Sequence, residues 1–225
     1  MINILLEGYD IDAAWLYEGL QKYIKSNRKV VVIAFSFRGN RVRSVEDWNL
    51  FYSKENGKYY GGITGGFSSF GLPESNITFL NYFTDTKETA MEKVKQADIL
   101  YYLGGLPDQM MDRIMEFDLY DMLLHHQGIV MGYSAGAVIQ LAEYHLSPDD
   151  DYAEFGYYKG IPYLSDFYLE VHYQGTDIQN RAITRVLKER SKPVYAMHRG
   201  HGAIIVENGI LHTLGEVKVV QPSET

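Results

Sequence analysis

The feature that most constrains the fold is a set of short apolar runs that contain no polar alternation. The clearest is 29–35, Lys-Val-Val-Val-Ile-Ala-Phe. A strand with one covered face alternates apolar and polar residues, whereas an uninterrupted β-branched run is typical of a parallel strand covered on both faces. Stretches with helical spacing, such as 12–24, separate these runs. The alternation predicts an α/β fold: one doubly wound, mostly parallel sheet with helices on both faces.

The other expected elements follow from the same patterns. Strands are predicted at 2–6, 76–80, 97–103, 128–132 and 167–172, and helices at 45–52, 85–96, 107–126, 135–143 and 176–190. Four glycines between 61 and 66 indicate a loop or broken helices. Residues 144–165 are expected to be rich in loops. Short strands at 193–196, 203–206, 210–214 and 217–220, with a turn at Asn208-Gly209, indicate a small C-terminal antiparallel addition. With no repeat or linker, residues 1–225 are expected to form one domain.

Composition excludes several classes of function. The net charge is −8 and no run of Lys and Arg is present, so a nucleic-acid partner is not expected. The chain has no Cys, which excludes disulfides and cysteine nucleophiles. No apolar stretch reaches the roughly 18 residues of a membrane span. The N-terminus has no basic segment of the kind that opens a signal peptide. We therefore expect a cytoplasmic protein with no membrane partner.

The motif Gly-Tyr-Ser-Ala-Gly-Ala at 132–137 carries the strongest functional signal. It follows a buried strand and opens a helix, which is the setting of a nucleophile elbow. Small residues on both sides of Ser134 permit the tight turn that presents its hydroxyl at the carboxyl end of the sheet. The pattern predicts that Ser134 is a nucleophile. A second backbone donor for an oxyanion hole is expected at Gly105, which ends a neighbouring strand, to act with the N–H of Ala135.

A serine hydroxyl needs a base, and His172 is the predicted one. It closes the strand at 167–172, so it is expected at the same edge of the sheet as Ser134. His198 and His201 also follow a strand end and are the second choice, either as bases or as substrate-binding residues. Their spacing does not fit a helical metal site, and we expect no metal and no cofactor. For the carboxylate that orients the base, the residues leave Asp149, Asp150, Asp151 and Glu170 open.

These residues resemble a known family. Gly132–Ala137, preceded by Leu-Gly-Gly at 103–105 and followed by the histidine strand Leu-Glu-Val-His-Tyr at 169–173, is similar to the peptidase E family of serine peptidases, which includes aspartyl dipeptidases and has cyanophycinase as a relative. The resemblance implies a fold like that of class I glutamine amidotransferases. It also implies a triad of Ser134, His172 and an acid at or next to Asp149.

The resemblance also exposes a departure. Some relatives carry the acid as a Glu in a late loop, but the corresponding loop here, 198–202, holds no carboxylate. We predict a serine peptidase that hydrolyses small peptides through an acyl-enzyme on Ser134, with Asp-X dipeptides as the substrates that the resemblance implies. The alternatives are an esterase and a non-catalytic binding module of the same fold. The esterase is disfavoured because no His-Gly-Gly-Gly segment is present. Glutamine amidotransfer is disfavoured because it needs a cysteine.

Overall fold

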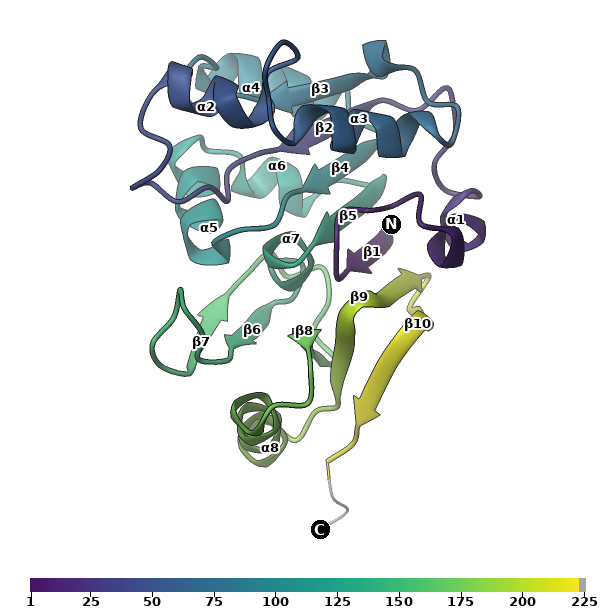
Figure 1. Cartoon of the computed structure of the whole chain (residues 1–225), viewed down its shortest axis with the longest axis vertical. Helices are drawn as coiled ribbons and strands as arrows, with labels where there is room; N and C mark the ends of the chain where they lie inside the picture. The colour runs from purple at the N-terminus through teal and green to yellow at the C-terminus, as the bar shows by residue number, and fades with distance from the viewer. Residues whose placement is uncertain (223–225) are drawn as a thin grey trace.

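A parallel sheet forms the centre of the protein (Figure 1). The computed structural model describes residues 1–222. Five parallel strands lie in the order β1-β5-β4-β2-β3. Their bounds are β1 Ile2–Leu6, β2 Val30–Ile33, β3 Ile77–Leu80, β4 Ile99–Tyr102 and β5 Ile129–Tyr133. The uninterrupted apolar runs therefore form parallel strands, as the sequence predicted.

Both faces of this sheet are covered by helices, as the pattern predicted. Successive residues of β2 point to opposite faces: Val31 and Ile33 join one buried cluster, and Val30 and Val32 join the other. The first face packs against α4 (Lys87–Lys95), α5 (Pro107–Glu116), α6 (Tyr120–Leu124) and α7 (Ala135–Val138). The second packs against α1 (Ala14–Leu20), α2 (Val45–Tyr52) and α3 (Tyr60–Ser68). No helix within residues 1–222 is long and apolar enough to cross a membrane.

The C-terminal part adds antiparallel strands to the parallel sheet. A short 3-10 helix, η1 (Glu74–Asn76), precedes β3, and β6 (Glu143–Leu146) pairs with β7 (Gly156–Lys159) as a separate two-stranded sheet. The strand β9 (Val194–Glu207) runs antiparallel to both β1 and β10 (Ile210–Val220), and parallel to β8 (Tyr168–Tyr173). The helix α8 (Asp177–Arg190) connects β8 to β9. Four short strands were expected where two long ones, β9 and β10, form a hairpin whose turn is Asn208-Gly209, both with positive φ.

The glycine-rich segment differs from its prediction, because residues 60–68 form the continuous helix α3. Ile63 and Phe67 of this helix are buried in the second face of the sheet. At Gly66, a Cβ would lie 2.9 Å from the side chain of Ile11, so the glycine allows the helix to pack closely. Tertiary burial here outweighs the low helix propensity of glycine.

Two predicted helices are shorter than expected. The helix expected at 107–126 is divided into α5 and α6 at Asp118, which has φ 54°. The N–H of Leu119 bonds to the carbonyl of Ile114 and the N–H of Asp118 to that of Met115, which is the Schellman pattern that ends a helix. The helix expected at 135–143 ends at Val138, and residues 143–146 form β6 instead. The segment expected to be rich in loops therefore contains two strands.

Candidate active site

Ser134 lies in a strained turn between β5 and α7. Its backbone has φ 52° and ψ −114°, a conformation that costs a non-glycine residue free energy and that clusters at functional sites. The N–H of Ser134 bonds to the carbonyl of Leu6 at 3.0 Å, which fixes the turn to the end of β1. The geometry is that of the nucleophile elbow predicted from the motif.

The two glycines that flank Ser134 are required by close backbone contacts. A Cβ on Gly132 would lie 2.3 Å from the carbonyl oxygen of Gly136. A Cβ on Gly136 would lie 2.1 Å from the carbonyl oxygen of Tyr102 in β4. Neither position can hold a larger residue without movement of the backbone. The Gly-x-Ser-x-Gly spacing therefore follows from the packing of the turn against its own helix and the neighbouring strand.

His172 reaches Ser134 from a bulge in β8. Residues 170 and 173 of β8 pair with residues 196 and 198 of β9, so β8 carries one extra residue at this point. His172 has φ 54°, and its carbonyl accepts a hydrogen bond from Nε2 of Gln179 at 3.0 Å. Ser134 Oγ lies 2.7 Å from His172 Nε2. The structure thus brings together the serine and histidine that the sequence singled out, within hydrogen-bond distance.

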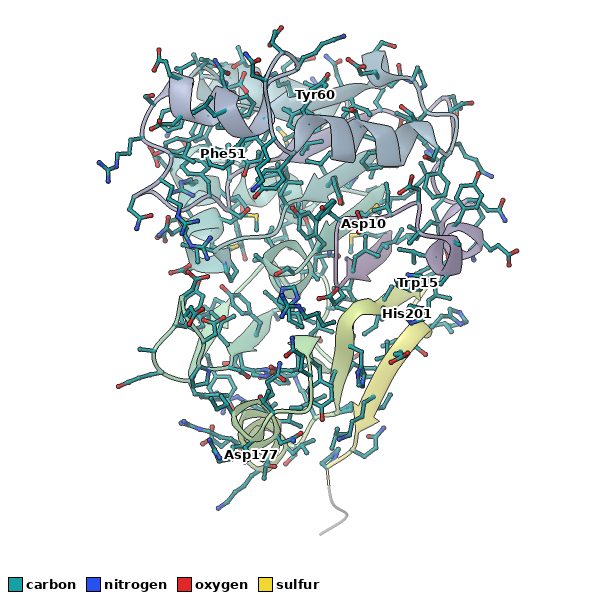
Figure 2. All side chains as sticks on the ribbon, in the orientation of Figure 1. Asp10, Trp15, Phe51, Tyr60, Asp177 and His201 are labelled. Carbon is teal, nitrogen blue, oxygen red and sulfur yellow. The ribbon has the colours of Figure 1, made fainter. Side chains whose placement is uncertain are left out.

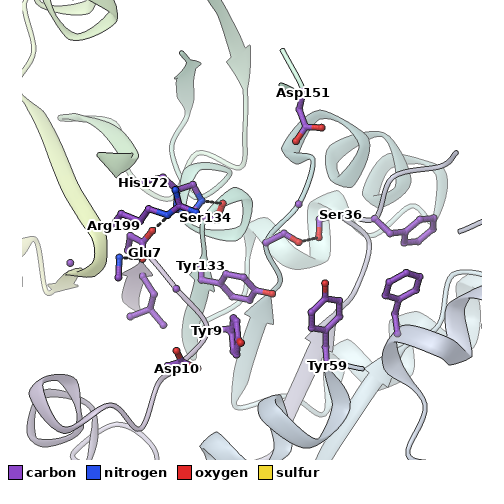
Figure 3. A pocket seen from close by; sticks show the side chains of 18 of the residues that line it. Glu7, Tyr9, Asp10, Ser36, Tyr59, Tyr133, Ser134, Asp151, His172 and Arg199 are labelled. Atoms are coloured by element: carbon purple, nitrogen blue, oxygen red, sulfur yellow. Dashed lines mark hydrogen bonds and ion pairs between the residues drawn. The ribbon is translucent and has the colours of Figure 1, made fainter. Parts of the chain in front are cut away.

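The carboxylate that contacts His172 is Glu7, which sequence reasoning missed. Glu7 follows β1 directly and is buried; its Oε1 contacts His172 Nδ1, and its Oε2 accepts the N–H of Gly200 at 2.5 Å (Figure 3). Burial by itself raises the pKa of Glu7. The hydrogen bonds from His172 and Gly200, together with the charge of Arg199, lower it by more than burial raises it, so the pKa of Glu7 is below its usual value. Glu7 is therefore held as a carboxylate. Its position after a strand end was the available signal.

Among the described residues, none of the four carboxylates considered from the sequence forms a hydrogen bond or ion pair with His172, although Asp149, Asp150 and Asp151 line the same cleft. Asp149 Oδ1 accepts the N–H groups of Asp151 and Tyr152 and shapes their loop. Asp151 pairs with Arg38. Glu170 was expected to share a strand face with His172, but the bulge separates them, and Glu170 is buried against His145. The structure pairs Glu7 with His172 in the place expected for Asp149, whose Oδ1 accepts backbone N–H groups of its own loop.

Gly105 and Ala135 lie where the sequence placed the candidate oxyanion donors, at the ends of β4 and β5. Gly105 has φ +140°, and a Cβ there would lie 2.3 Å from the carbonyl oxygen of Ser36. The turn is fixed by Ser36, whose carbonyl accepts the N–H of Leu106 at 2.8 Å. Within residues 1–222, neither Gly105 N–H nor Ala135 N–H donates to a protein acceptor.

A cleft of about 810 Å³ surrounds these groups. Glu7, Gly105, Ser134 and His172 line it, together with the loop at 149–151 and Arg199. His198 and His201 do not line it, so the expectation that they contact substrate is not met by the geometry. Both lie within 4 Å of Glu216 in β10.

The ring of His201 packs against Trp15 with the centroids 4.4 Å apart. Figure 2 labels the two residues, which are neighbours in that view. From the same loop, Arg199, Gly200 and Gly202 line the cleft.

The strained serine contacts an imidazole, and the imidazole contacts a buried carboxylate. On an α/β sheet, this arrangement is typical of serine hydrolases. The model of peptidase family S51 matches residues 52–214. The chain belongs to this family and is a serine peptidase. The predicted peptidase E-like resemblance is confirmed.

Two solved structures share the fold. One is a protein provisionally named peptidase E, from Listeria monocytogenes EGD-e, with a TM-score of 0.65 and 17% identity; the alignment covers 96% of this chain and 98% of that one. The other is a peptidase from an acI-B1 Actinobacterium, with a TM-score of 0.64 and 16% identity, over 99% of this chain and 95% of that one. No curated protein matches.

Proposed function

We propose that the protein hydrolyses short peptides through an acyl-enzyme on Ser134, with His172 as the base and Glu7 as the carboxylate that orients it. The observation that carries the proposal is the contact of Ser134 Oγ with His172 Nε2 at 2.7 Å while Nδ1 of the same ring faces Glu7. A carboxylate on Nδ1 keeps the proton there and leaves Nε2 free to accept one from the serine. Each ring nitrogen thus has the partner that the chemistry requires.

In the acylation step, Ser134 Oγ attacks the carbonyl carbon of the scissile peptide bond and its proton passes to His172 Nε2. The C–N bond then breaks, and the imidazolium returns the proton to the leaving amine. Water enters next, gives a proton to Nε2 and attacks the ester carbonyl carbon; the C–Oγ bond then breaks, and Nε2 returns its proton to Ser134 Oγ, which releases the acid and restores the serine. Glu7 stays ionised throughout and stabilises the imidazolium. Its lowered pKa supports this assignment.

The negative oxygen that forms in each step needs donors already in place. Gly105 N–H and Ala135 N–H are assigned to this role because both lie beside Ser134 and neither is bonded to a described protein group. The contact of Gly105 with Ser36 holds its turn rigid. Preorganised donors of this kind contribute about 10²–10³-fold to the rate each.

An alternative role as a binding module was suggested by the loop at 198–202, which lacks a carboxylate. That loop instead gives the N–H of Gly200 to Glu7. The triad carboxylate comes from the opposite end of the chain, so the departure in the loop does not remove a catalytic group. This contact favours the peptidase.

The family resemblance implies Asp-X dipeptides as substrates, and the proposed hydrolysis at Ser134 does not depend on that finer implication. Arg38, Arg41 and Arg199 are the guanidinium groups that line the cleft. Arg38 is already paired with Asp151, which leaves Arg41 and Arg199 to bind an aspartate side chain or a terminal carboxylate.

The acyl-enzyme is tested by rapid acid quench and intact-mass measurement during turnover of a dipeptide panel. We expect a covalent acyl adduct on the wild type and none on Ser134→Ala. Turnover without any adduct, or turnover that survives in Ser134→Ala, would contradict the proposal. The panel includes Asp-Leu to test the finer claim directly.

A further inference from the structure

The cleft has a second part that the catalytic groups do not use. Seven aromatic side chains line the cleft, and we call five of them the aromatic wall: Phe37, Phe51, Tyr52, Tyr59 and Tyr133. Three of these rings, those of Phe51, Tyr52 and Tyr59, contact one another. Tyr59 stacks on Phe51 with the centroids 6.0 Å apart and lies 6.0 Å from Tyr52. The five residues come from three segments that are distant in sequence but line the same cleft. These are the loop after β2, the helix α2 with the residues that follow it, and the end of β5.

Tyr133 connects the aromatic wall to the nucleophile, because it precedes Ser134 in the chain. Its ring lies over Gly104, where a Cβ would be 2.4 Å from the ring carbons. Tyr9 packs edge-on against the same ring, with the centroids 5.9 Å apart. Tyr133 is therefore held in one orientation in the cleft. A rigid aromatic surface of this kind binds an apolar side chain with little loss of conformational entropy.

The side of Ser134 on which the aromatic wall lies decides which substrate residue it contacts. His172 must give its proton to the leaving amine, so the leaving residue lies on the histidine side of Ser134. In the view of Figure 3, His172 lies to the left of the Ser134 hydroxyl, whereas Tyr133 and Tyr59 lie below it and toward the right. The side chain of the acyl residue, the one that becomes esterified to Ser134, therefore points toward the aromatic wall.

The charge of this part of the cleft disfavours an acidic side chain. Burial raises the pKa of Tyr52, and it raises the pKa of Tyr133 to about 12, so both phenols stay neutral. Arg38 gives both Nε and Nη2 to Asp151. Arg41 and Arg199 are both exposed, and they are the cations through which an aspartate would have to be bound. Neutral rings instead match a neutral, planar side chain.

We infer that the acyl-side subsite selects a large aromatic residue, phenylalanine or tyrosine, over aspartate. The inference rests on the proposed function, since it places the scissile bond at Ser134. It names the substrate class: short peptides whose acyl residue is aromatic. Tyr59 is its specificity-determining residue, because its ring touches both Phe51 and Tyr52 and faces the cleft.

The test is kcat/KM for Phe-Leu, Tyr-Leu, Ala-Leu and Asp-Leu with the wild type, Tyr59→Ala, Tyr59→Phe and Arg41→Ala. We expect the wild type to prefer Phe-Leu over Ala-Leu by at least about tenfold, within the range for a filled apolar pocket. Tyr59→Ala should reduce that ratio about tenfold, whereas Tyr59→Phe and Arg41→Ala should keep it. Preference for Asp-Leu, or an unchanged ratio in Tyr59→Ala, overturns the inference. Should Tyr59→Ala not fold, as judged by thermal melting, Phe51→Leu takes its place.

Failure of the subsite is distinguished from failure of the proposed function by a binding measurement. If no peptide is hydrolysed, the proposed function fails, and calorimetric titration of Ser134→Ala with Phe-Leu and Asp-Leu still tests the subsite. Tighter binding of Phe-Leu supports it. Equal or tighter binding of Asp-Leu contradicts it.

Discussion

Residues 1–222 contain two groupings of serine, histidine and glutamate, and only one of them has the contacts of a catalytic triad. In the first, His172 lies between its partners, with Ser134 on Nε2 and Glu7 on Nδ1. In the second, the carboxylate is central: Glu170 Oε2 accepts from Ser147 Oγ at 2.8 Å and lies 2.7 Å from His145 Nε2. Ser147 contacts a carboxylate and not an imidazole, so this grouping lacks the serine–histidine contact through which a triad activates its nucleophile.

Solvent access separates the two groupings further. The side chain of His172 is 47% exposed and faces the cleft, whereas that of His145 is 0% exposed. Glu7 and Glu170 are buried alike, at 6% and 5% of their side-chain area. The buried grouping ties β6 to β8, and the open one presents a hydroxyl to substrate. Residue identity alone therefore does not define a triad; the order of contacts and the access of the histidine do.

The largest difference is expected at the two serines. Ser134→Ala should lower kcat/KM for a cleaved dipeptide by about 10⁴-fold or more, since it removes the nucleophile. Ser147→Ala should leave kcat/KM within about twofold, because a single hydrogen bond to Glu170 contributes to stability only. Steady-state kinetics on both variants measures this. Comparable losses in the two would remove the distinction between the groupings.

The two glutamates are expected to separate activity from stability. Glu7→Gln should reduce kcat by about 10³-fold or more, because an amide no longer favours the tautomer that accepts the serine proton. Glu170→Gln should mainly lower Tm, through a cost of about 1–3 kcal/mol at a buried hydrogen-bonded group. Kinetics and thermal denaturation of both variants check the pair. A large loss of kcat in Glu170→Gln with an unchanged Tm would show that the buried grouping takes part in catalysis, and would contradict this prediction.

Gly105→Ala is expected to have an intermediate effect. Its Cβ would collide with the carbonyl of Ser36 and displace the candidate oxyanion donor, which should cost about 10²-fold in kcat. Gly71→Ala is the matched control, because Gly71 also has positive φ but its Cβ would meet nothing within 4 Å. That variant should lose about 1 kcal/mol of stability from backbone strain and keep its kcat. Equal kcat values for the two variants would argue against Gly105 as a donor.

The smallest effect concerns pH and the stability contributed by Glu7. Its pKa is lowered in the folded protein, so its ionised form stabilises the fold above the unfolded pKa of about 4.3. This contribution is lost as pH falls below that value through the folded pKa. Urea unfolding of the wild type and Glu7→Gln between pH 3 and pH 7 should therefore show a gap that is constant near neutrality and narrows below about pH 4.3. A gap that widens in acid would contradict the direction of the shift.

The fold, Ser134 and His172 could be predicted from the sequence because each depends on a pattern of neighbouring residues. Uninterrupted β-branched runs identify buried parallel strands, and the residues around Ser134 show why the turn needs glycine. His172 could be found because it closes a strand. The bulge that turns its side chain toward Ser134 is not visible in the sequence, and neither is the separation of Glu170 that results from it.

Glu7 could not be paired with His172 by spacing, because 165 residues separate them. Only the three-dimensional arrangement brings them together: β1 lies beside β5, and β9 carries Gly200 over the same carboxylate. The expectation for 61–66 was wrong for a related reason. Glycine has low helix propensity, but α3 is stabilised by the burial of Ile63 and Phe67, which local pattern does not measure.

The most direct test of the central claim is labelling of the native protein with a fluorophosphonate, followed by peptide mapping of the modified residue. A fluorophosphonate reacts only with a serine whose hydroxyl is activated and accessible. The account predicts one adduct, on Ser134, that is absent in Ser134→Ala and strongly slowed in Glu7→Gln, with Ser147 unmodified. A folded wild type that remains unlabelled, or one labelled at Ser147, would contradict it.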